Sequence, residues 1–196
     1  MRPIVEIELN PDRVEEGYAV RSYSITFFLG QHIVVASRPI EVYLPLAGLN
    51  PDYVELFHED MSQPVPFRIS EDGKYAIFMS DDFSEYFLVN PLITVSYDAS
   101  GGTEIPTETI LKGSAVAPEA PKKSGYAFVG WELPDGTPYD GTPLLSDVTL
   151  KAAWGYEITI DPDDGTPLQS LLVKEGDTPK LPTLTREGFV FDKWLL

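Results

Sequence analysis

The sequence predicts a mainly β protein with little helix, in which an antiparallel β-sandwich is followed by small tandem modules. Short segments that alternate apolar and polar residues are separated by turn residues along the whole chain. A stretch of the chain repeats itself at a fixed offset near the carboxyl end. Between residues 93 and 155, every apolar stripe of helical spacing is interrupted by Pro or Gly.

The amino-terminal ninety residues predict the sandwich. Turn signals fall at Asn10-Pro11-Asp12, at Gly30, and in the stretches 48–52 and 70–73. Many short strands with turns every eight to twelve residues are typical of an immunoglobulin-like sandwich. We therefore expect an immunoglobulin-like module over residues 1–90, with strands at residues 4–9, 21–29, 33–36, 40–46, 54–58, 65–69, 75–79 and 86–89.

The repeat has an offset of 63 residues and aligns 93–133 with 156–196 without a gap. The recurring residues are glycines, which allow special backbone conformations, and large aromatic residues, which pack in cores. The repeated residues predicted to be structural or to lie in the core are Gly102, Gly113, Gly125, Phe128 and Trp131 in the first copy, and Gly165, Gly176, Gly188, Phe191 and Trp194 in the second. Trp154 at the end of the first copy joins this set.

Each copy predicts strands separated by glycine turns. In the first copy we expect strands at 93–97, 108–111 and 126–131. The first copy then continues to Trp154, whereas the second copy stops at Leu196, before its version of that ending. A module without its last third leaves a sheet edge uncovered, so we expect the chain to be a segment of a longer protein. The predicted modules are 1–90, 91–155 and 156–196, the last incomplete at its carboxyl end.

The residues of the first copy carry a family resemblance. The copy has Asp98 before Gly101-Gly102-Thr103, then Gly125-Tyr126-Ala127-Phe128 with Trp131, and closes with Thr149-Leu150-Lys151-Ala152-Ala153-Trp154. This pattern resembles the internalin B-type B-repeat, also called the Listeria/Bacteroides repeat, of bacterial surface proteins. The resemblance implies a β-grasp-like module in tandem outside the cell, with no catalytic residues. The second copy has Asp164 in place of the first glycine.

A second resemblance concerns the end of the amino-terminal module. Residues Pro66-Phe67, Asp72-Gly73-Lys74-Tyr75 and Phe83-Ser84-Glu85-Tyr86 are similar to the terminal hairpins of a β-module of Gram-positive surface proteins. This resemblance implies the same extracellular setting.

Composition excludes several classes of site and partner. The chain has 31 Asp+Glu against 14 Lys+Arg, a net charge of −17, which argues against nucleic acid or an anionic membrane as partner. It has no cysteine, so disulfides, zinc–thiolate sites and thiol nucleophiles are excluded. No apolar run is long enough to span a bilayer, and the first residues do not form a signal peptide.

Candidate catalytic and metal-binding residues are few, and a structural role is the better interpretation of each. His58-Glu59-Asp60 lies where a strand runs into a turn, and the only other histidine is His32. Asp161-Pro162-Asp163-Asp164-Gly165 departs from the spacing of a calcium loop and is typical of a hairpin turn. Asp81, Asp82 and Glu85 could bind a cation weakly, but a solvated loop is the better account. We therefore predict no catalytic residue, no cofactor and no metal site.

The aromatic residues raise one further alternative. Trp131, Trp154 and Trp194, with Tyr126 and Phe128, could stack on sugar rings, but their fixed repeat positions in alternating strands favour a packed core. No Gly-x-Ser-x-Gly nucleophile elbow is present. The single lysine of residues 1–90, Lys74, lies in an expected turn, which argues against a buried lysine crosslink there.

The sequence as a whole predicts a non-enzymatic segment of a bacterial cell-surface or secreted protein. We expect it to act as a stalk or spacer, a monomeric part of a longer chain that lies at the surface or in the cell wall. The joints at 90–91 and 155–156 are too short for floppy linkers, so we expect a semi-rigid rod. Two alternatives stay open: adhesion modules that bind a host protein or glycan, and accessory modules of a larger extracellular enzyme.

Overall fold

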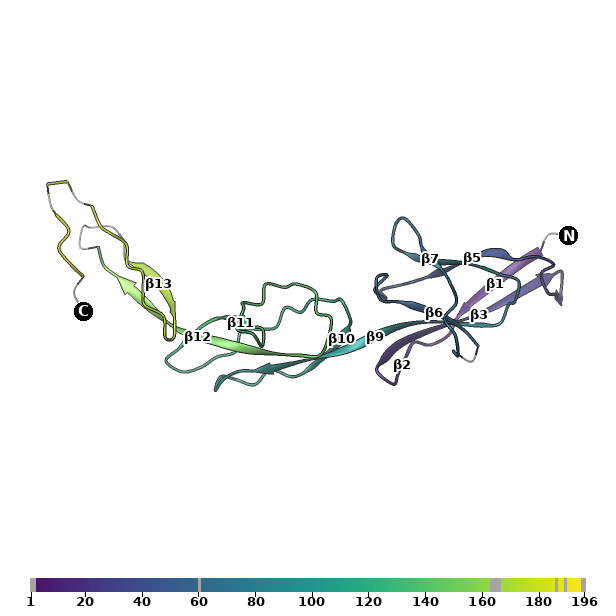
Figure 1. Cartoon of the computed structure of the whole chain (residues 1–196), viewed down its shortest axis with the longest axis horizontal. Helices are drawn as coiled ribbons and strands as arrows, with labels where there is room; N and C mark the ends of the chain where they lie inside the picture. The colour runs from purple at the N-terminus through teal and green to yellow at the C-terminus, as the bar shows by residue number, and fades with distance from the viewer. Residues whose placement is uncertain (1–2, 60, 163–166, 186, 189, 195–196) are drawn as a thin grey trace. The chain divides into compact units, whose positions relative to one another are not determined.

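The computed structural model describes residues 3–59, 61–162, 167–185, 187–188 and 190–194 (Figure 1). Every regular element in these ranges is a β-strand, and no helix occurs among them. The prediction of a mainly β protein with little helix is therefore confirmed.

The chain divides into two compact units. The first consists of Met1–Val95, Glu108–Val116 and Thr142–Asp147, and the second of Ser96–Thr107, Ala117–Gly141 and Val148–Leu196. Both units therefore draw residues from the first copy of the repeat. The modules 1–90, 91–155 and 156–196 follow the repetition in the sequence, and their boundaries stay predictions.

The first unit is built from two antiparallel sheets. In the larger sheet β3 (Tyr18–Leu29) lies between β1 (Pro3–Leu9) and β9 (Glu85–Asp98). Four shorter strands extend this sheet: β2 (Arg13–Glu15) and β4 (His32–Ile33) on β3, and β6 (Glu55–His58) and β10 (Glu108–Leu111) on β9. The smaller sheet has the order β5 (Ile40–Pro45), β8 (Tyr75–Ser80) and β7 (Arg68–Ile69).

The apolar core of the first unit lies between these two sheets. Strand alternation buries Val42 and Leu44 of β5 and leaves Glu41 and Tyr43 exposed. The buried cluster draws on both sheets and consists of Tyr23, Ile25, Val42, Leu44, Leu46, Leu49, Val54, Leu56, Ala76, Phe78, Tyr86 and Leu88. Each large apolar side chain buried here stabilises the fold by about 1.5–3 kcal/mol. The predicted β-sandwich is therefore confirmed, while its immunoglobulin-like type stays a prediction.

Strand β9 runs from the sandwich into the first repeat copy without a break. Its residues 85–91 pair with β3, and its residues 92–95 pair with β10. The sequence predicted two strands separated at Asn90-Pro91, which is wrong. Proline is tolerated here because the ladder uses its carbonyl: Pro91 O accepts a hydrogen bond from the backbone N–H of Lys112 (2.8 Å).

The second unit contains a similar continuous strand. Strand β12 (Val148–Ile160) pairs with β11 (Ala127–Glu132) through residues 151–155 and with β13 (Gln169–Lys174) through residues 155–160. The predicted joint at Gly155-Tyr156 therefore lies inside a strand. A Cβ atom on Gly155 would lie 2.2 Å from the carbonyl oxygen of Val173, so only glycine fits at this point.

The two copies of the repeat open with the same hairpin in the same register. Leu92 pairs with Leu111, and 63 residues later Gly155 pairs with Lys174. The hydrogen bond from Lys112 N to Pro91 O recurs from Glu175 N to Trp154 O (2.9 Å). The offset seen in the sequence is thus also an offset in backbone pairing, and the β-grasp-like assignment stays a prediction.

Two predicted strands are shorter than expected. The expected strand at 33–36 is reduced to His32–Ile33, and that at 65–69 is reduced to Arg68–Ile69. In the second case Pro64 and Pro66 remove two backbone donors from the start of the segment, which prevents a longer ladder.

A buried amide fixes the start of the first repeat copy within the first unit. The side chain of Asn90 is fully buried, and its Oδ1 accepts a hydrogen bond from the backbone N–H of Asn50 (2.6 Å). The side-chain amide of Asn50 in turn donates to the carbonyl oxygen of Lys112 (3.2 Å). The next residue, Gly113, packs so closely that a Cβ atom there would lie 2.4 Å from the Tyr53 ring and 2.5 Å from the Asn50 amide.

We predict that Gly113→Ala destabilises the chain more than Gly176→Ala does. The two glycines hold equivalent repeat positions with φ of 83° and 90°, so both substitutions carry the cost of a left-handed alanine, about 1–2 kcal/mol. Only Gly113 is packed, whereas a Cβ on Gly176 meets nothing within 4 Å, so Gly113→Ala should cost about 1–3 kcal/mol more. Hydrogen exchange of the full chain, read at residues 46–56 and 108–116 for one variant and 169–178 for the other, measures both opening free energies. Equal costs would contradict the packing argument.

Candidate functional site

The best-formed side-chain cluster of the repeats is aromatic and lies in the second unit. The indole Nε1 of Trp154 donates a hydrogen bond to the carbonyl oxygen of Ala99 (3.0 Å). Its ring lies over Gly102, where a Cβ atom would be only 2.6 Å from Cζ2 of Trp154. Phe128 contacts Trp154 and Trp131 edge to face, at centroid distances of 5.8 and 5.5 Å. Trp131 and Trp154 are only 6% and 5% exposed, so their faces are covered by protein rather than open to a sugar ring.

A polar cluster surrounds the point where the first copy meets the second, within the second unit. We call Tyr126, Glu132, Tyr156 and Lys174 the joint cluster. The rings of Tyr126 and Tyr156 lie 5.1 Å apart, and a hydrogen bond with Tyr126 raises the pKa of Tyr156 to about 12. The ammonium of Lys174 forms an ion pair with Glu132, and this hydrogen bond raises the pKa of Lys174. Each pair joins one residue of the first copy to one of the second.

The remaining repeated glycines occupy turns. Gly125, Gly176 and Gly188 have φ of 79°, 90° and 80°, a backbone conformation that other residues rarely adopt. A Cβ atom on any of the three would meet nothing within 4 Å, so backbone conformation rather than packing requires glycine there. Gly165 lies outside the described residues.

The second copy retains an aromatic pair, but its described residues form no strand equivalent to the one that carries the pair in the first copy. Phe191 contacts Trp194 edge to face at 5.4 Å, much as Phe128 contacts Trp131. No strand is present among the described residues after β13, although the equivalent residues of the first copy form β11.

His58, which the sequence singled out, has contacts that are typical of a structural role. His58 Nε2 lies 2.6 Å from Ser84 Oγ, and its ring stacks on Tyr86 at 4.5 Å. The Asp82 carboxylate is 4.0 Å from the same nitrogen. A catalytic triad needs the acid on Nδ1 and the hydroxyl on Nε2, so this geometry differs from that of a triad. Asp60, the last residue of the His58-Glu59-Asp60 motif, lies outside the described residues.

The candidate cation-binding residues do not converge where the structure describes them. No group of three or more His, Asp or Glu side chains among the described residues is placed to hold a metal ion. Glu85 accepts a hydrogen bond from the Asn10 side chain (3.3 Å), and the Asp82 carbonyl accepts one from Ser80 Oγ (2.7 Å), so both residues have protein partners. Of the possible calcium loop, Asp163, Asp164 and Gly165 lie outside the described residues.

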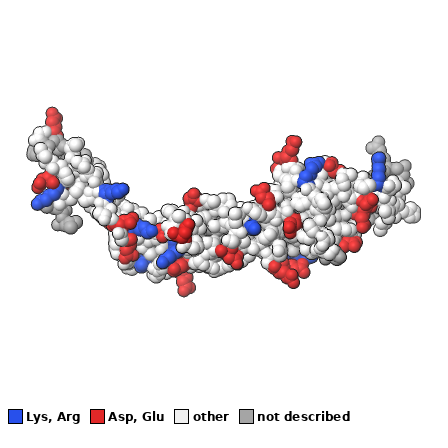
Figure 2. Space-filling model, viewed as in Figure 1, with Lys and Arg blue, Asp and Glu red and all other residues white. Residues whose placement is uncertain are grey.

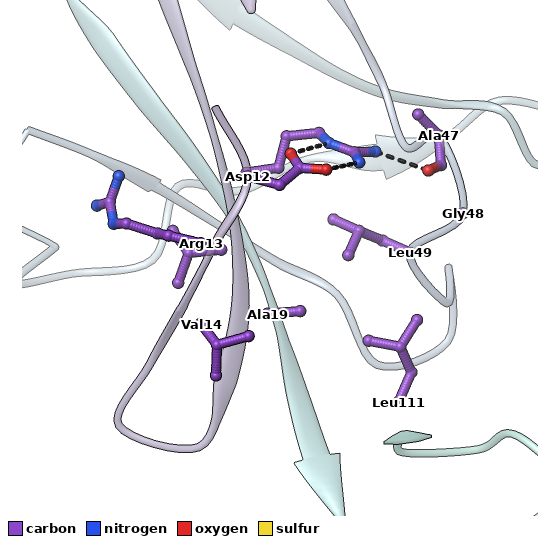
Figure 3. Close-up of a pocket in the computed structure, with 10 residues that line it drawn as sticks. Asp12, Arg13, Val14, Ala19, Ala47, Gly48, Leu49 and Leu111 are labelled. Carbon is purple, nitrogen blue, oxygen red and sulfur yellow. Dashed lines mark hydrogen bonds and ion pairs between the residues drawn. The ribbon is translucent and has the colours of Figure 1, made fainter. Parts of the chain in front are cut away.

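A pocket of about 340 Å³ in the first unit is lined by Asp12, Arg21, Leu49 and Leu111, among others (Figure 3). Arg21 Nε donates to Asp12 Oδ1 (2.7 Å), and a second guanidinium nitrogen donates to Asp12 Oδ2. The third nitrogen donates to the carbonyl oxygens of Leu46 (2.8 Å) and Ala47 (2.7 Å). The hydrogen bond to Arg21 lowers the pKa of Asp12. All three nitrogens of the Arg21 guanidinium therefore donate to protein acceptors, and the group forms part of the pocket wall.

The molecular surface carries many more acidic than basic groups. Figure 2 shows carboxylates scattered over the face in view, with lysine and arginine in isolated positions. The described residues contain no helix long and apolar enough to cross a membrane.

A family model for the Listeria-Bacteroides repeat domain matches residues 94–153 and again residues 156–196, together just over half of the chain. The chain belongs to this repeat family. Domains of the Listeria-Bacteroides repeat family typically occur in extracellular surface proteins. No curated protein and no solved structure matches the chain.

The family assignment agrees with the backbone geometry. The second match begins at Tyr156, directly after Gly155, the residue at which β12 pairs with both β11 and β13. The repeat domain thus opens in the middle of a strand.

Two features of the first unit were missed in the sequence. The first is the ion pair between Arg21, a strand residue, and Asp12, a turn residue. Its only sign in the sequence was a charged side chain within the alternating segment 18–29. The second feature is an exposed aromatic pair, Tyr43 and Tyr75, whose rings lie 6.2 Å apart on the outer face of the smaller sheet. Both depend on residues that are distant in sequence.

We predict that Asp12→Asn lowers the free energy of unfolding of the first unit by about 0.5–1 kcal/mol at pH 7, because the Asp12 carboxylate is half exposed and the pair is partly screened. The folded-state pKa of Asp12 is lowered, so its stabilisation is present above the unfolded pKa near 3.8 and is lost as the pH falls through the folded value. Urea unfolding at pH 7 and below pH 3, followed by tyrosine near-ultraviolet circular dichroism, should show the gap closing in acid. Glu71→Gln, an exposed turn carboxylate in the same unit, is the control. A gap that stays constant with pH would contradict the ion-pair argument.

Proposed function

We propose that this chain is a non-catalytic part of a bacterial cell-surface or secreted multidomain protein, in which its modules act as spacers. The unbroken course of β9 and β12 through the points where sequence modules meet carries this proposal. A spacer has to transmit position along a chain, and a shared strand does so better than a flexible linker does. Under this proposal the protein is of the internalin-like, Gram-positive type and the segment is monomeric.

The joint between the two repeat copies is reinforced by side chains. Gly155 lets the backbone of β13 approach closely, and a larger residue would collide with Val173. The Glu132–Lys174 ion pair and the Tyr126–Tyr156 contact cross the same joint. These contacts support limited bending between the copies, because bending would separate both pairs at once.

The repeat family supports the extracellular setting, and the net charge argues against nucleic acid and anionic membranes as partners. A net charge of −17 keeps the chain soluble and disfavours self-association, nucleic acid and anionic membranes. The family resemblance implies no catalytic residues, which supports a non-catalytic role. The spacer would then present a binding or catalytic domain of the same protein away from the cell.

We predict that a flexible insertion between residues 155 and 156 increases the range of orientations between the two repeat copies. Because the chain has no cysteine, labels on Glu119→Cys and Lys180→Cys report one distance only. Double electron–electron resonance should give a narrow distance distribution in the otherwise unchanged chain and a broad one after insertion of Gly-Ser-Gly-Ser between Gly155 and Tyr156. The same insertion after Gly136, in a turn of the first copy, is the control and should leave the distribution narrow. A broad distribution without any insertion would contradict the spacer role.

Adhesion is a second candidate function, either alone or as an accessory to an extracellular enzyme. Tyr43 and Tyr75 are 45% and 36% exposed and lie on the sheet that also exposes Met79 (59%). Tyr43 Oη donates to Glu41 (2.7 Å), which also accepts from Arg68 (2.8 Å), so the ring is held in place. A held, exposed aromatic pair with polar neighbours suits a glycan or a host protein surface.

We predict that, if this face binds, Tyr43→Ser and Tyr75→Ser each reduce retention of the full chain on a glycan array by tenfold or more, about 1.4 kcal/mol. Val35→Ser removes an apolar side chain that is 84% exposed elsewhere in the first unit and should leave retention unchanged. Equal retention by all four proteins would remove adhesion through this face.

A further inference from the structure

A second apolar cluster lies on the outer face of the larger sheet, the face that points away from the smaller sheet. Along β9, Leu88 belongs to the core between the sheets, so its neighbours Phe87 and Val89 point to the outer face. These two side chains pack with Val20 of β3, and all three are at most 5% exposed. Phe57 of β6 packs against them. The outward-facing residues of a sandwich are usually polar, so a buried apolar cluster on this face is unusual.

A pocket of about 360 Å³ opens over this cluster. The buried side chains of Val20 and Val89 form its floor. Tyr18, which is 41% exposed, and the half-buried Phe57 and Met61 line it as well. The volume lies within the range of small-ligand sites, about 300–1,000 Å³.

The pocket does not arise at an end of the sheet. Its residues from β3 and β9 lie where these two strands pair with each other, with Val20 opposite Val89. The first strand, β1, pairs with the other end of β3, where Pro3 lies opposite Leu29. Leu29 is nine residues from Val20 along β3, a distance of about 30 Å in a strand.

Three exposed glutamates, Glu15, Glu16 and Glu55, also line the pocket. Glu15 forms an ion pair with Arg13 (3.0 Å). Glu16 and Glu55 form no ion pair with any residue that the structure describes. An apolar floor beneath two unpaired carboxylates suits a ligand group that has an apolar stem and a cationic end.

The same sheet face already holds an arginine of the chain itself. Cζ of Arg13 lies 5.3 Å from the centre of the Phe87 ring, and Arg13 Nε donates to Glu15 Oε2 (3.0 Å). Arg13 lies opposite Val20 on the adjacent strand, next to the pocket. A guanidinium thus gains both an aromatic face and a carboxylate here. The pocket offers the same combination, aromatic rings beside two unpaired carboxylates.

We propose that this pocket binds an arginine side chain of a partner protein. The aliphatic part of the arginine packs on Val20 and Val89, and its guanidinium pairs with Glu16 and Glu55. Arginine is favoured over lysine because a planar guanidinium stacks on aromatic rings and binds carboxylates through two nitrogens. The net charge of −17 attracts a basic partner. The site lies on a different sheet from the exposed tyrosine pair, and it does not depend on the spacer role.

The probe is N-acetyl-arginine amide, titrated into the full chain with ¹³C-labelled methionine methyl groups. The chain has three methionines, so each signal can be followed separately. The signal of Met61, which lines the pocket, should shift with half-saturation at about 1–10 mM, as expected for a ligand of this size. The signal of Met79, an exposed residue of the smaller sheet, should not shift. No shift of Met61 at about 50 mM probe overturns the proposal.

Matched ligands and variants identify the contacts. N-acetyl-citrulline amide has nearly the same shape without the charge, and should bind about tenfold more weakly. Glu16→Gln and Glu55→Gln should each weaken binding of the arginine probe about threefold, while Glu71→Gln, an exposed turn carboxylate of the same unit, should not change it. Equal binding of citrulline, or equal effects of the three substitutions, overturns the proposal.

Free arginine separates the two possible sources of the guanidinium. Its own carboxylate is repelled by the acidic pocket, so it should bind more weakly than the amide probe, in which the backbone is blocked as in a protein. Tighter binding of free arginine overturns the proposal, because the free amino acid would then be the occupant.

Discussion

The structure depends on backbone hydrogen bonding along two strands that each serve two modules. Residues 85–91 of β9 complete a sheet of the sandwich, and residues 92–95 begin the first repeat copy. Strand β12 does the same for the two copies. Because an unpaired buried N–H or C=O group is costly, neither strand can bend away from its partners at the joint without loss on both sides. The module boundaries are therefore among the most constrained parts of the backbone.

Much of the repeat geometry could be predicted from the sequence, because it depends on local patterns. Alternation predicted the hairpin of 93–97 and 108–111, and the offset of 63 residues predicted its recurrence, which the pairing of Leu92 with Leu111 and of Gly155 with Lys174 confirms. The continuity of β9 could not be predicted, because proline is usually a break in a strand. The backbone partner of the Pro91 carbonyl, the N–H of Lys112, lies far along the chain.

The sequence could predict which residue types form the contacts of the candidate site, but not which residues contact one another. The recurrence of glycine and tryptophan indicated close packing, yet nothing in the sequence joins Gly102 to Trp154 or Gly113 to Tyr53. The repeat itself is misleading at one position. Gly113 and Gly176 are equivalent, but only the first is packed, because it meets the Asn50–Tyr53 turn of a different module. A repeated residue can thus be required for its backbone conformation in one copy and for its small size in the other.

A module defined by sequence and a module defined by folding need not share their limits. The first copy ends within β12, at Trp154. The indole of Trp154 completes the core of the first copy, while the backbone carbonyl of Trp154 accepts a hydrogen bond from the N–H of Glu175 in the second copy. One residue therefore stabilises two copies by two different groups. It follows that the core of a copy and the first hairpin of its successor are energetically coupled, since loss of strand geometry at 154–155 removes both. In this chain the tandem arrangement of the two copies therefore contributes to stability as well as to length.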